Sequence, residues 1–76
     1  MQIEYSKKAI KYINSLDKLT KKRLREAIEK IPFGDIKKLQ DVENGYRLRI
    51  GDLRVLFTPE DDIIFIDNII PRRASI

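Results

Sequence analysis

Apolar and charged residues alternate almost without interruption from Tyr46 to Phe57, and this pattern limits the possible folds of the chain more than any other feature. A period of two is typical of a β-strand that buries one of its faces. Gly51-Asp52 lies in the middle of the pattern and is a two-residue turn signal of the glycine-first kind. The segment is therefore predicted to form a β-hairpin.

The two-residue loop also predicts the register of this hairpin. The facing pairs are Ile50 with Leu53, Arg49 with Arg54, Leu48 with Val55 and Arg47 with Leu56. One face then carries only apolar and aromatic side chains, those of Tyr46, Leu48, Ile50, Leu53, Val55 and Phe57. The opposite face carries three arginines, Arg47, Arg49 and Arg54.

The N-terminal part of the chain is predicted to form a short strand and two helices. We expect the strand at Met1 to Tyr5, and a helix from about Lys7 to Leu16 with Ser6 as its N-cap. A second helix is expected from about Leu19 or Thr20 to Ile31, because the proline that follows disfavours helical geometry in the residue before it. The short break between the helices predicts an antiparallel helical hairpin.

The C-terminal part is predicted to supply most of the sheet. Pro32 to Asn44 is interpreted as a connection that Ile36 and Leu39 anchor to the core. A last strand, Asp62 to Ile70, is apolar on both faces, so we expect it in the centre of the sheet. The order βααβββ predicts one domain over residues 1–76. Its class is α+β, with two layers, in which the helical hairpin packs on one face of a mostly antiparallel four-stranded sheet.

The composition excludes several kinds of chemistry. The 76 residues include no cysteine and no histidine, which excludes disulfides, Cys-His zinc sites and nucleophiles activated by histidine. The net charge is +4, so nucleic acid and acidic protein segments are the first partners to expect. No apolar stretch is long enough to span a membrane, and the first residues do not resemble a signal peptide. We therefore expect a cytoplasmic protein without a membrane partner.

The three arginines of the hairpin are the strongest candidate site. Arg49 faces Arg54, and like charges that face each other destabilise a sheet. A local arrangement that costs stability points to a function, and the planar arginine fork suits phosphate or carboxylate. One interpretation is an anion site, most simply for a nucleic-acid phosphate. The other is an ordinary solvated face of a basic protein, with Asp67 on the last strand as an ion-pair partner. The sequence favours neither.

Two other basic clusters accompany these arginines. Arg72-Arg73 follows the last strand and would close one end of the same face if that strand lies beside the hairpin. Taken alone, the pair is better explained as a charged terminus. The other cluster lies at the start of the second helix and is typical of a solvated helix face; its members are Lys21, Lys22, Arg23 and Arg25.

The segment GYRLRIGDLRVLF resembles the core motif of the RelE/ParE superfamily, the toxins of bacterial and archaeal type II toxin–antitoxin pairs. The resemblance covers residues 34–73 by motif and the whole chain by order of elements. It implies the RelE-like fold and a cognate antitoxin that wraps the toxin and neutralises it. For the RelE branch it also implies an endoribonuclease that cleaves mRNA in the ribosomal A site and so inhibits translation. Such toxins use no metal and no cofactor.

The resemblance also assigns roles to individual residues. Arg47 and Arg49 match the paired basic positions of the first hairpin strand, and Arg54 matches the arginine of the second. Arg72 matches the basic residue of the closing motif, with Arg73 as the alternative. These matches imply that Arg47, Arg49, Arg54 and Arg72 stabilise the transition state of the cleavage, and that Arg73 joins them in binding the nucleic acid.

The chain departs from the family pattern at its end. Members commonly close with a tyrosine or histidine that assists proton transfer, whereas this sequence has Ile76 there. Tyr46 lies on the predicted core face and is a poor substitute, and Glu43 is a weak candidate base. Three alternatives follow: slow cleavage by arginines alone, an impaired or truncated toxin that only binds its antitoxin, and a ParE-like inhibitor of DNA gyrase that acts by protein binding. The paired arginines place RNA cleavage first.

Overall fold

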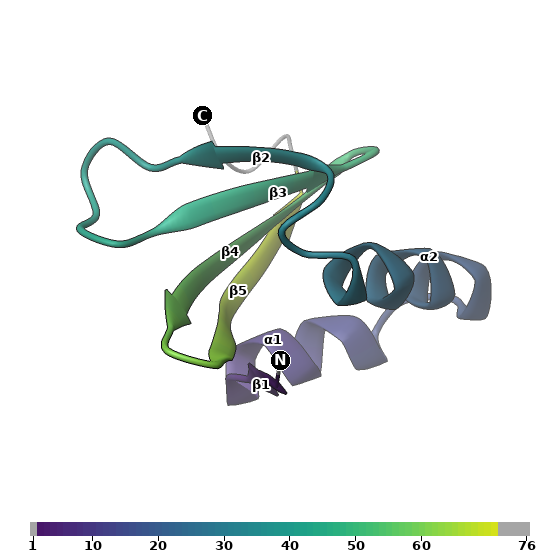
Figure 1. Ribbon diagram of the computed structural model, residues 1–76. Helices are drawn as coiled ribbons and strands as arrows, with labels where there is room; N and C mark the ends of the chain where they lie inside the picture. Colours follow the sequence, from purple (N-terminus) through teal and green to yellow (C-terminus); the bar gives the residue numbers. More distant parts are fainter. Residues whose placement is uncertain (1, 72–76) are drawn as a thin grey trace.

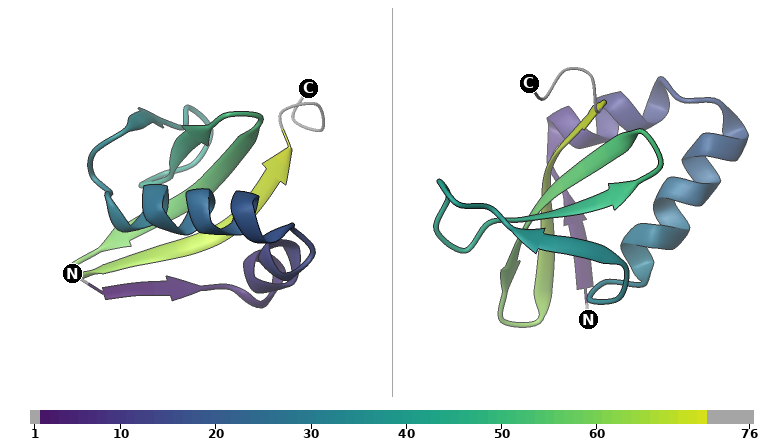
Figure 2. Two further views of the ribbon diagram at one scale, coloured as in Figure 1. Left: turned by 90° about the vertical axis from the view of Figure 1, so that its right-hand side faces the viewer. Right: turned by 90° about the horizontal axis from the view of Figure 1, so that it is seen from above.

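The computed structural model describes residues 2–71, which form two helices on one face of a five-stranded sheet (Figures 1 and 2). In chain order the elements are β1 (Gln2–Tyr5), α1 (Lys7–Asn14), α2 (Lys18–Glu29), β2 (Asp35–Lys38), β3 (Tyr46–Ile50), β4 (Leu53–Glu60) and β5 (Ile63–Pro71). The strands are arranged β1-β5-β4-β3-β2, and only β1 and β5 run parallel to each other. The predicted α+β fold in two layers is confirmed.

Polar side chains fix the start of both helices. Ser6 is the N-cap of α1, as predicted, and its Oγ accepts a hydrogen bond of 3.0 Å from the Ala9 N–H. Asp17 is the N-cap of α2 and accepts one of 3.1 Å from the Thr20 N–H. Hydrogen bonds from the side chain and backbone of Thr20 lower the pKa of the Asp17 carboxyl. A lowered carboxyl pKa means that this cap contributes stability at neutral pH and loses it as the pH falls through that pKa.

The helices differ slightly from the prediction. α1 ends at Asn14 and α2 begins at Lys18, because the carboxylate of Asp17 caps the second helix. The two helices diverge from their shared loop in Figure 2 instead of lying side by side along their length. α1 packs chiefly against β5, while the contacts of α2 with the sheet involve β3.

The core lies between the helices and the middle strands. Residues that are completely inaccessible to solvent come from both layers: Ala9, Leu24, Ile28, Val55 and Ile66. Around them pack Ile13, Ile31, Leu48, Phe57, Ile64 and Ile69, each less than one tenth exposed. The apolar face predicted for the hairpin is therefore the face that the helices cover.

The expectation of four strands was wrong, because the predicted connection Pro32 to Asn44 contains the short edge strand β2. β2 pairs antiparallel with β3 and places Ile36 opposite Leu48. Its sequence, DIKK, has one apolar residue, so no period of two can be read from it. Pairing with β3 gives this segment its extended form. The last strand lies inside the sheet between β1 and β4, as its two apolar faces predict.

Neither helix in the described part of the chain is both long and apolar enough to cross a bilayer.

Candidate nucleic-acid interface

The hairpin has the register that its sequence predicts. Arg49 faces Arg54, Arg47 faces Leu56 and Ile50 faces Leu53. Gly51 adopts a φ of 55°, the left-handed conformation that a glycine-first turn requires at this position. The three hairpin arginines therefore lie on one face of β3 and β4, and this face points away from the helices.

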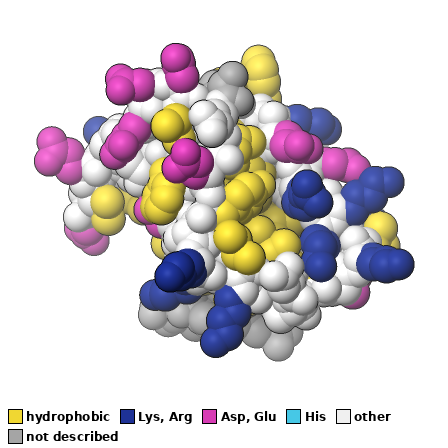
Figure 3. All heavy atoms as spheres, turned by 90° about the horizontal axis from the view of Figure 1, so that it is seen from below, with side chains coloured by type: hydrophobic (Ala, Val, Ile, Leu, Met, Phe, Trp, Pro, Cys, Tyr) yellow, Lys and Arg dark blue, Asp and Glu magenta, His cyan; other side chains and the backbone are white. Residues whose placement is uncertain are grey.

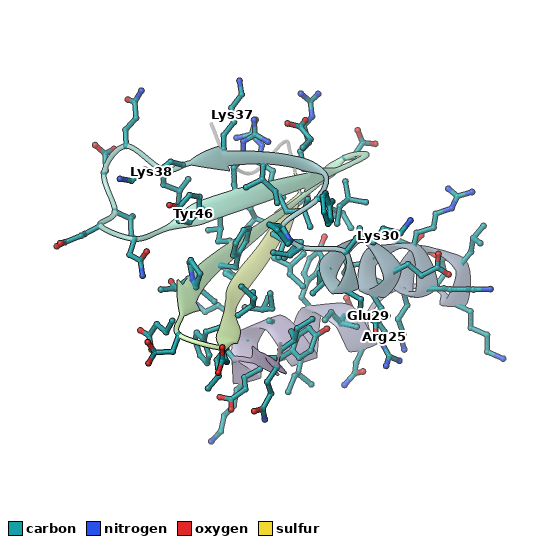
Figure 4. The ribbon with its side chains drawn as sticks, in the orientation of Figure 1. Arg25, Glu29, Lys30, Lys37, Lys38 and Tyr46 are labelled. Atoms are coloured by element: carbon teal, nitrogen blue, oxygen red, sulfur yellow. The ribbon has the colours of Figure 1, made fainter. Side chains whose placement is uncertain are left out.

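The edge strand β2 adds two charged residues to this face. Asp35 faces Arg49 across the strand pair, and Lys37 faces Arg47. Figure 4 shows Lys37 extending from β2 on the side of the sheet opposite the helices. We name the set Asp35, Lys37, Arg47, Arg49 and Arg54 the arginine face; it carries four positive charges and one negative charge. Sequence reasoning missed Asp35 and Lys37 because it did not predict β2.

The hairpin arginines are half-buried by their neighbours. The side chain of Arg47 is only 14% exposed. Arg47 pairs with Leu56 on β4, which in turn pairs with Asn68 on β5. Ile70 on β5 lies opposite Arg54. The aliphatic stems of the arginines thus lie against other side chains, and their charged ends lie in surroundings where water screens charge less well than in bulk solvent.

Two nitrogen atoms on this face are buried without a hydrogen-bond acceptor among the described residues: Nη1 of Arg47 and Nε of Arg54. A buried donor without an acceptor costs about 1–3 kcal/mol, and more when the group is charged. The ion pair between Arg47 Nη1 and Asp35 Oδ1 spans 3.8 Å, which is too long for a hydrogen bond. Both arginines consequently keep a buried donor that no described residue satisfies, beside guanidinium groups that are only partly buried.

Asp67 does not neutralise the arginine face. The register of β4 and β5 shifts at this point, so that Leu56 pairs with Asn68 and Phe57 with Ile66. Asp67 is the extra residue of this irregularity, and its Oδ2 accepts a hydrogen bond of 2.8 Å from Thr58 Oγ1. The interpretation of Asp67 as the ion-pair partner of the arginines is therefore wrong; within residues 2–71 that partner is Asp35.

The described tyrosines and Glu43 do not supply an acid–base group beside the arginines. Tyr46 lies on the core face, where its ring stacks on Phe57 with centroids 5.8 Å apart. Tyr5 lies on the helix side as well; burial raises the pKa of its hydroxyl, which Arg25 opposes and Glu29 reinforces. Glu43 is exposed in the loop between β2 and β3 and forms no ion pair with a described residue. Arg72, Arg73 and Ile76 lie outside the described residues.

The lysines and arginines of α2 form a separate basic surface. Figure 3 shows them on the helical side of the molecule, at the right of the view and around an apolar hollow, whereas acidic side chains gather at the upper left. Lys21 is half-buried, and Lys22, Arg23 and Arg25 are exposed. The exposure of Lys22, Arg23 and Arg25 agrees with the expected solvated helix face.

An apolar groove of about 160 Å³ opens on the helix side of the sheet, beyond the end of α2. It is lined by Ile31, Pro32, Ile36, Tyr46, Phe57, Pro59 and Ile64. Lys38 lies at its border, because it pairs with Tyr46 and shares the core-side face of the sheet (Figure 4). This part of the core face has no covering helix in the described chain.

Solved structures of known proteins share this fold over nearly the whole chain. A RelB–RelE antitoxin–toxin complex from Methanococcus jannaschii gives a TM-score of 0.78 at 23% identity, covering 93% of this chain and 92% of that one. An archaeal RelE–RelB complex from Pyrococcus horikoshii gives 0.75 at 29% identity, covering 93% of both chains. A YoeB dimer from Staphylococcus aureus gives 0.72 at 25% identity, covering 90% of this chain and 92% of that one.

No protein-family model matches the chain, and no curated protein matches it by sequence. The likeness therefore rests on the order and pairing of the elements together with the hairpin motif. The shared order and pairing of the elements agree with the resemblance that the segment GYRLRIGDLRVLF carries. The chain has the RelE-like fold and is similar over nearly its whole length to solved RelE and YoeB toxins.

Proposed function

We propose that the chain is the toxin of a type II toxin–antitoxin pair, and that it inhibits translation by cleaving mRNA in the ribosomal A site. The observation that carries the proposal is the arginine face itself, on which four cations and one carboxylate lie side by side on neighbouring strands. Several guanidinium forks on one cationic face favour an anion that brings several oxygen acceptors, as a phosphodiester does. Its place of action would be the cytoplasm, where ribosomes translate mRNA.

In the proposed reaction the ribose 2′-oxygen attacks the adjacent phosphorus and the bond to the 5′-oxygen breaks. The products are a cyclic phosphate and a 5′-hydroxyl, and the proton of the 2′-hydroxyl leaves while the 5′-oxygen gains one. Negative charge accumulates on the non-bridging oxygens in the transition state. Arg47 and Arg54 would donate hydrogen bonds to these oxygens, and Arg49 would add a third positive charge.

The motif match adds Arg72 and Arg73 to the proposed site. Arg72 would stabilise the transition state, and Arg73 would help to bind the nucleic acid. Because Ile76 occupies the position of the usual tyrosine or histidine, proton transfer would pass to water or to a ribosomal group. We therefore expect the rate to be limited by proton transfer and the binding of the phosphate to be retained.

The test is cleavage of a defined mRNA in a translation extract programmed with purified ribosomes. We expect cuts within the A-site codon, and each of Arg47→Ala, Arg49→Ala and Arg54→Ala is expected to reduce them about 100-fold or more, the typical loss for one oxyanion-stabilising donor. Cleavage that survives all three substitutions contradicts the arginine-face mechanism.

A second candidate function is inhibition of DNA gyrase in the manner of ParE. The observation that favours it is Ile76, because an inhibitor that acts by protein binding needs no proton-transfer residue. Inhibition of gyrase supercoiling by the purified protein, without any RNA cleavage, would support this candidate. Absence of both activities, and of growth arrest on expression, would leave a chain that only binds its antitoxin.

The proposed antitoxin partner is supported by the apolar groove, which has Lys38 at its border. A segment that buries these side chains would add the apolar contact area that a 76-residue domain lacks. Ligands that bind only the folded state raise the temperature of unfolding. We expect the product of the adjacent reading frame to co-purify with the chain, and the complex to unfold at a higher temperature than the chain alone in differential scanning calorimetry.

A further inference from the structure

A charged hollow of about 280 Å³ lies between α2, the loop over residues 30–34 and the end of β3. Its floor is apolar and consists of Ala27, Leu48 and Ile50. One wall is Phe33, which is 76% exposed and is the most exposed large hydrophobic residue of the described chain. Five charged residues complete the lining: Arg23, Glu26, Lys30, Asp35 and Arg49.

The loop fixes Phe33 in this position. Its N–H donates to the Lys30 carbonyl at 2.7 Å, and the Gly34 carbonyl accepts from the Ile36 N–H at 3.0 Å. Gly34 has a φ of 124°, and a Cβ there would lie 3.0 Å from Leu48 Cδ1. The glycine therefore lets the loop pass close over the core, while the following strand and the preceding helix hold both of its ends. The loop that exposes the aromatic ring to solvent is thus held by backbone hydrogen bonds on either side of it.

The charges around the ring favour an anion. Three cations and two carboxylates line the hollow, a net charge of +1. Lys30 is the C-cap residue of α2 and lies beside the loop that leads to β2 (Figure 4). Arg49 also belongs to the arginine face, so the hollow adjoins the proposed cleavage site.

We propose that this hollow binds one nucleotide of single-stranded RNA, with its base stacked on Phe33 and its phosphate held by Arg23, Lys30 and Arg49. Aromatic side chains stack on any base, and cations beside them hold the backbone. Glu26 and Asp35 supply acceptors for the amino groups of a base edge. The inference rests on the proposed function, because it extends the RNA path from the arginine face to a neighbouring nucleotide.

The position of Phe33 distinguishes a nucleotide from a docked protein segment. Phe33 lines the charged hollow but does not line the apolar groove, which lies beside Ile31 and Pro32. An apolar protein anchor would be expected in the groove, where the lining is almost entirely apolar. An aromatic ring flanked by cations suits a ligand with a π-face and a negative charge.

The test uses the purified chain, ¹⁵N-labelled, titrated with uridine and adenosine 5′-monophosphates and followed by nuclear magnetic resonance. Ribose 5-phosphate is the matched probe without a base. We expect both nucleotides to shift the amide signals of Phe33, Gly34 and Arg49, and to bind at least about fivefold more tightly than ribose 5-phosphate, the lower end of the measured stacking contributions. Phe33→Ala should abolish the difference between nucleotide and sugar phosphate.

Leu19→Ala is the control, because it removes another exposed apolar side chain, 57% exposed, from α2 and should leave nucleotide binding unchanged. Equal binding of nucleotides and ribose 5-phosphate would overturn the stacking role, as would nucleotide binding that survives Phe33→Ala. Shifts confined to other parts of the chain, or none at all, would overturn the site. A Phe33→Ala variant that binds nucleotides normally but loses the antitoxin would assign the ring to a protein interface instead. The titration needs no ribosomes. A negative result therefore overturns the nucleotide site without deciding whether the chain cleaves mRNA on the ribosome.

Discussion

Replacing Arg54 by methionine is expected to slow RNA cleavage about 100-fold or more while leaving the fold at least as stable as before. Arg54 faces Arg49, and its buried Nε has no hydrogen-bond acceptor among the described residues. Removing one of two facing like charges should stabilise the sheet, because like charges directly opposite each other destabilise it. Methionine keeps most of the apolar stem, so the packing beside Ile70 is retained. The loss of a donor to the developing charge should cost about 100-fold or more in rate.

A variant that loses cleavage but keeps its stability shows that the arginine is functional and not structural. Cleavage is measured on programmed ribosomes, and the free energy of unfolding by urea denaturation. Lys22→Met is the matched control, because it removes the same charge from an exposed position of α2. It should leave both quantities nearly unchanged. If Arg54→Met instead lowers the free energy of unfolding by more than about 1 kcal/mol, the arginine is a structural residue and the proposal is wrong.

Leu24→Ala is expected to remove a large part of the stability of the chain. Leu24 is 0% exposed and lies in α2, the helix that faces β3. Truncating a buried leucine costs about 2–5 kcal/mol, because the lost transfer free energy adds to the cost of the cavity. At about 0.05–0.15 kcal/mol per residue, the whole domain has only about 4–11 kcal/mol. The variant should therefore unfold at a much lower urea concentration or not fold at all.

The same helix provides the control for this substitution. Leu19 is 57% exposed, so Leu19→Ala makes the same chemical change with almost no loss of buried area. It should shift the urea midpoint only slightly, since exposed substitutions usually stay within about 0.5 kcal/mol. Equal effects of the two substitutions would contradict the packing of α2 on the sheet.

The hairpin shows how far sequence patterns reach. Its alternation, its turn and the facing of Arg49 and Arg54 are all local properties, and the structure confirms each of them. A strand that is apolar on both faces must be covered on both sides, which places β5 inside the sheet. By contrast, β2 was not predictable, because a four-residue strand with one apolar residue acquires its conformation from β3.

Part of the candidate site was likewise predictable from the sequence, and part was not. Arg47, Arg49 and Arg54 were identified from their spacing, but Asp35 and Lys37 join them only through the pairing of β2 with β3. Asp67 was misplaced because the register shift in β5 makes it an extra residue, and a period of two cannot show such a shift in advance. Phe33 gave no signal at all, because a lone aromatic after Pro32 is as typical of the core as of the surface.

By itself the sequence determined which face of the hairpin is buried and which carries the arginines, because side-chain alternation is fixed by the backbone of a strand. It also determined the starting cap of α1 and the exclusion of histidine and cysteine chemistry. Only the tertiary structure decided that the arginines are half-buried, that two of their nitrogens have no acceptor among residues 2–71, and that Phe33 faces a charged hollow beside them. The physical reason is that burial and hydrogen bonding depend on residues distant in the chain, whose arrangement follows from packing and not from any local period.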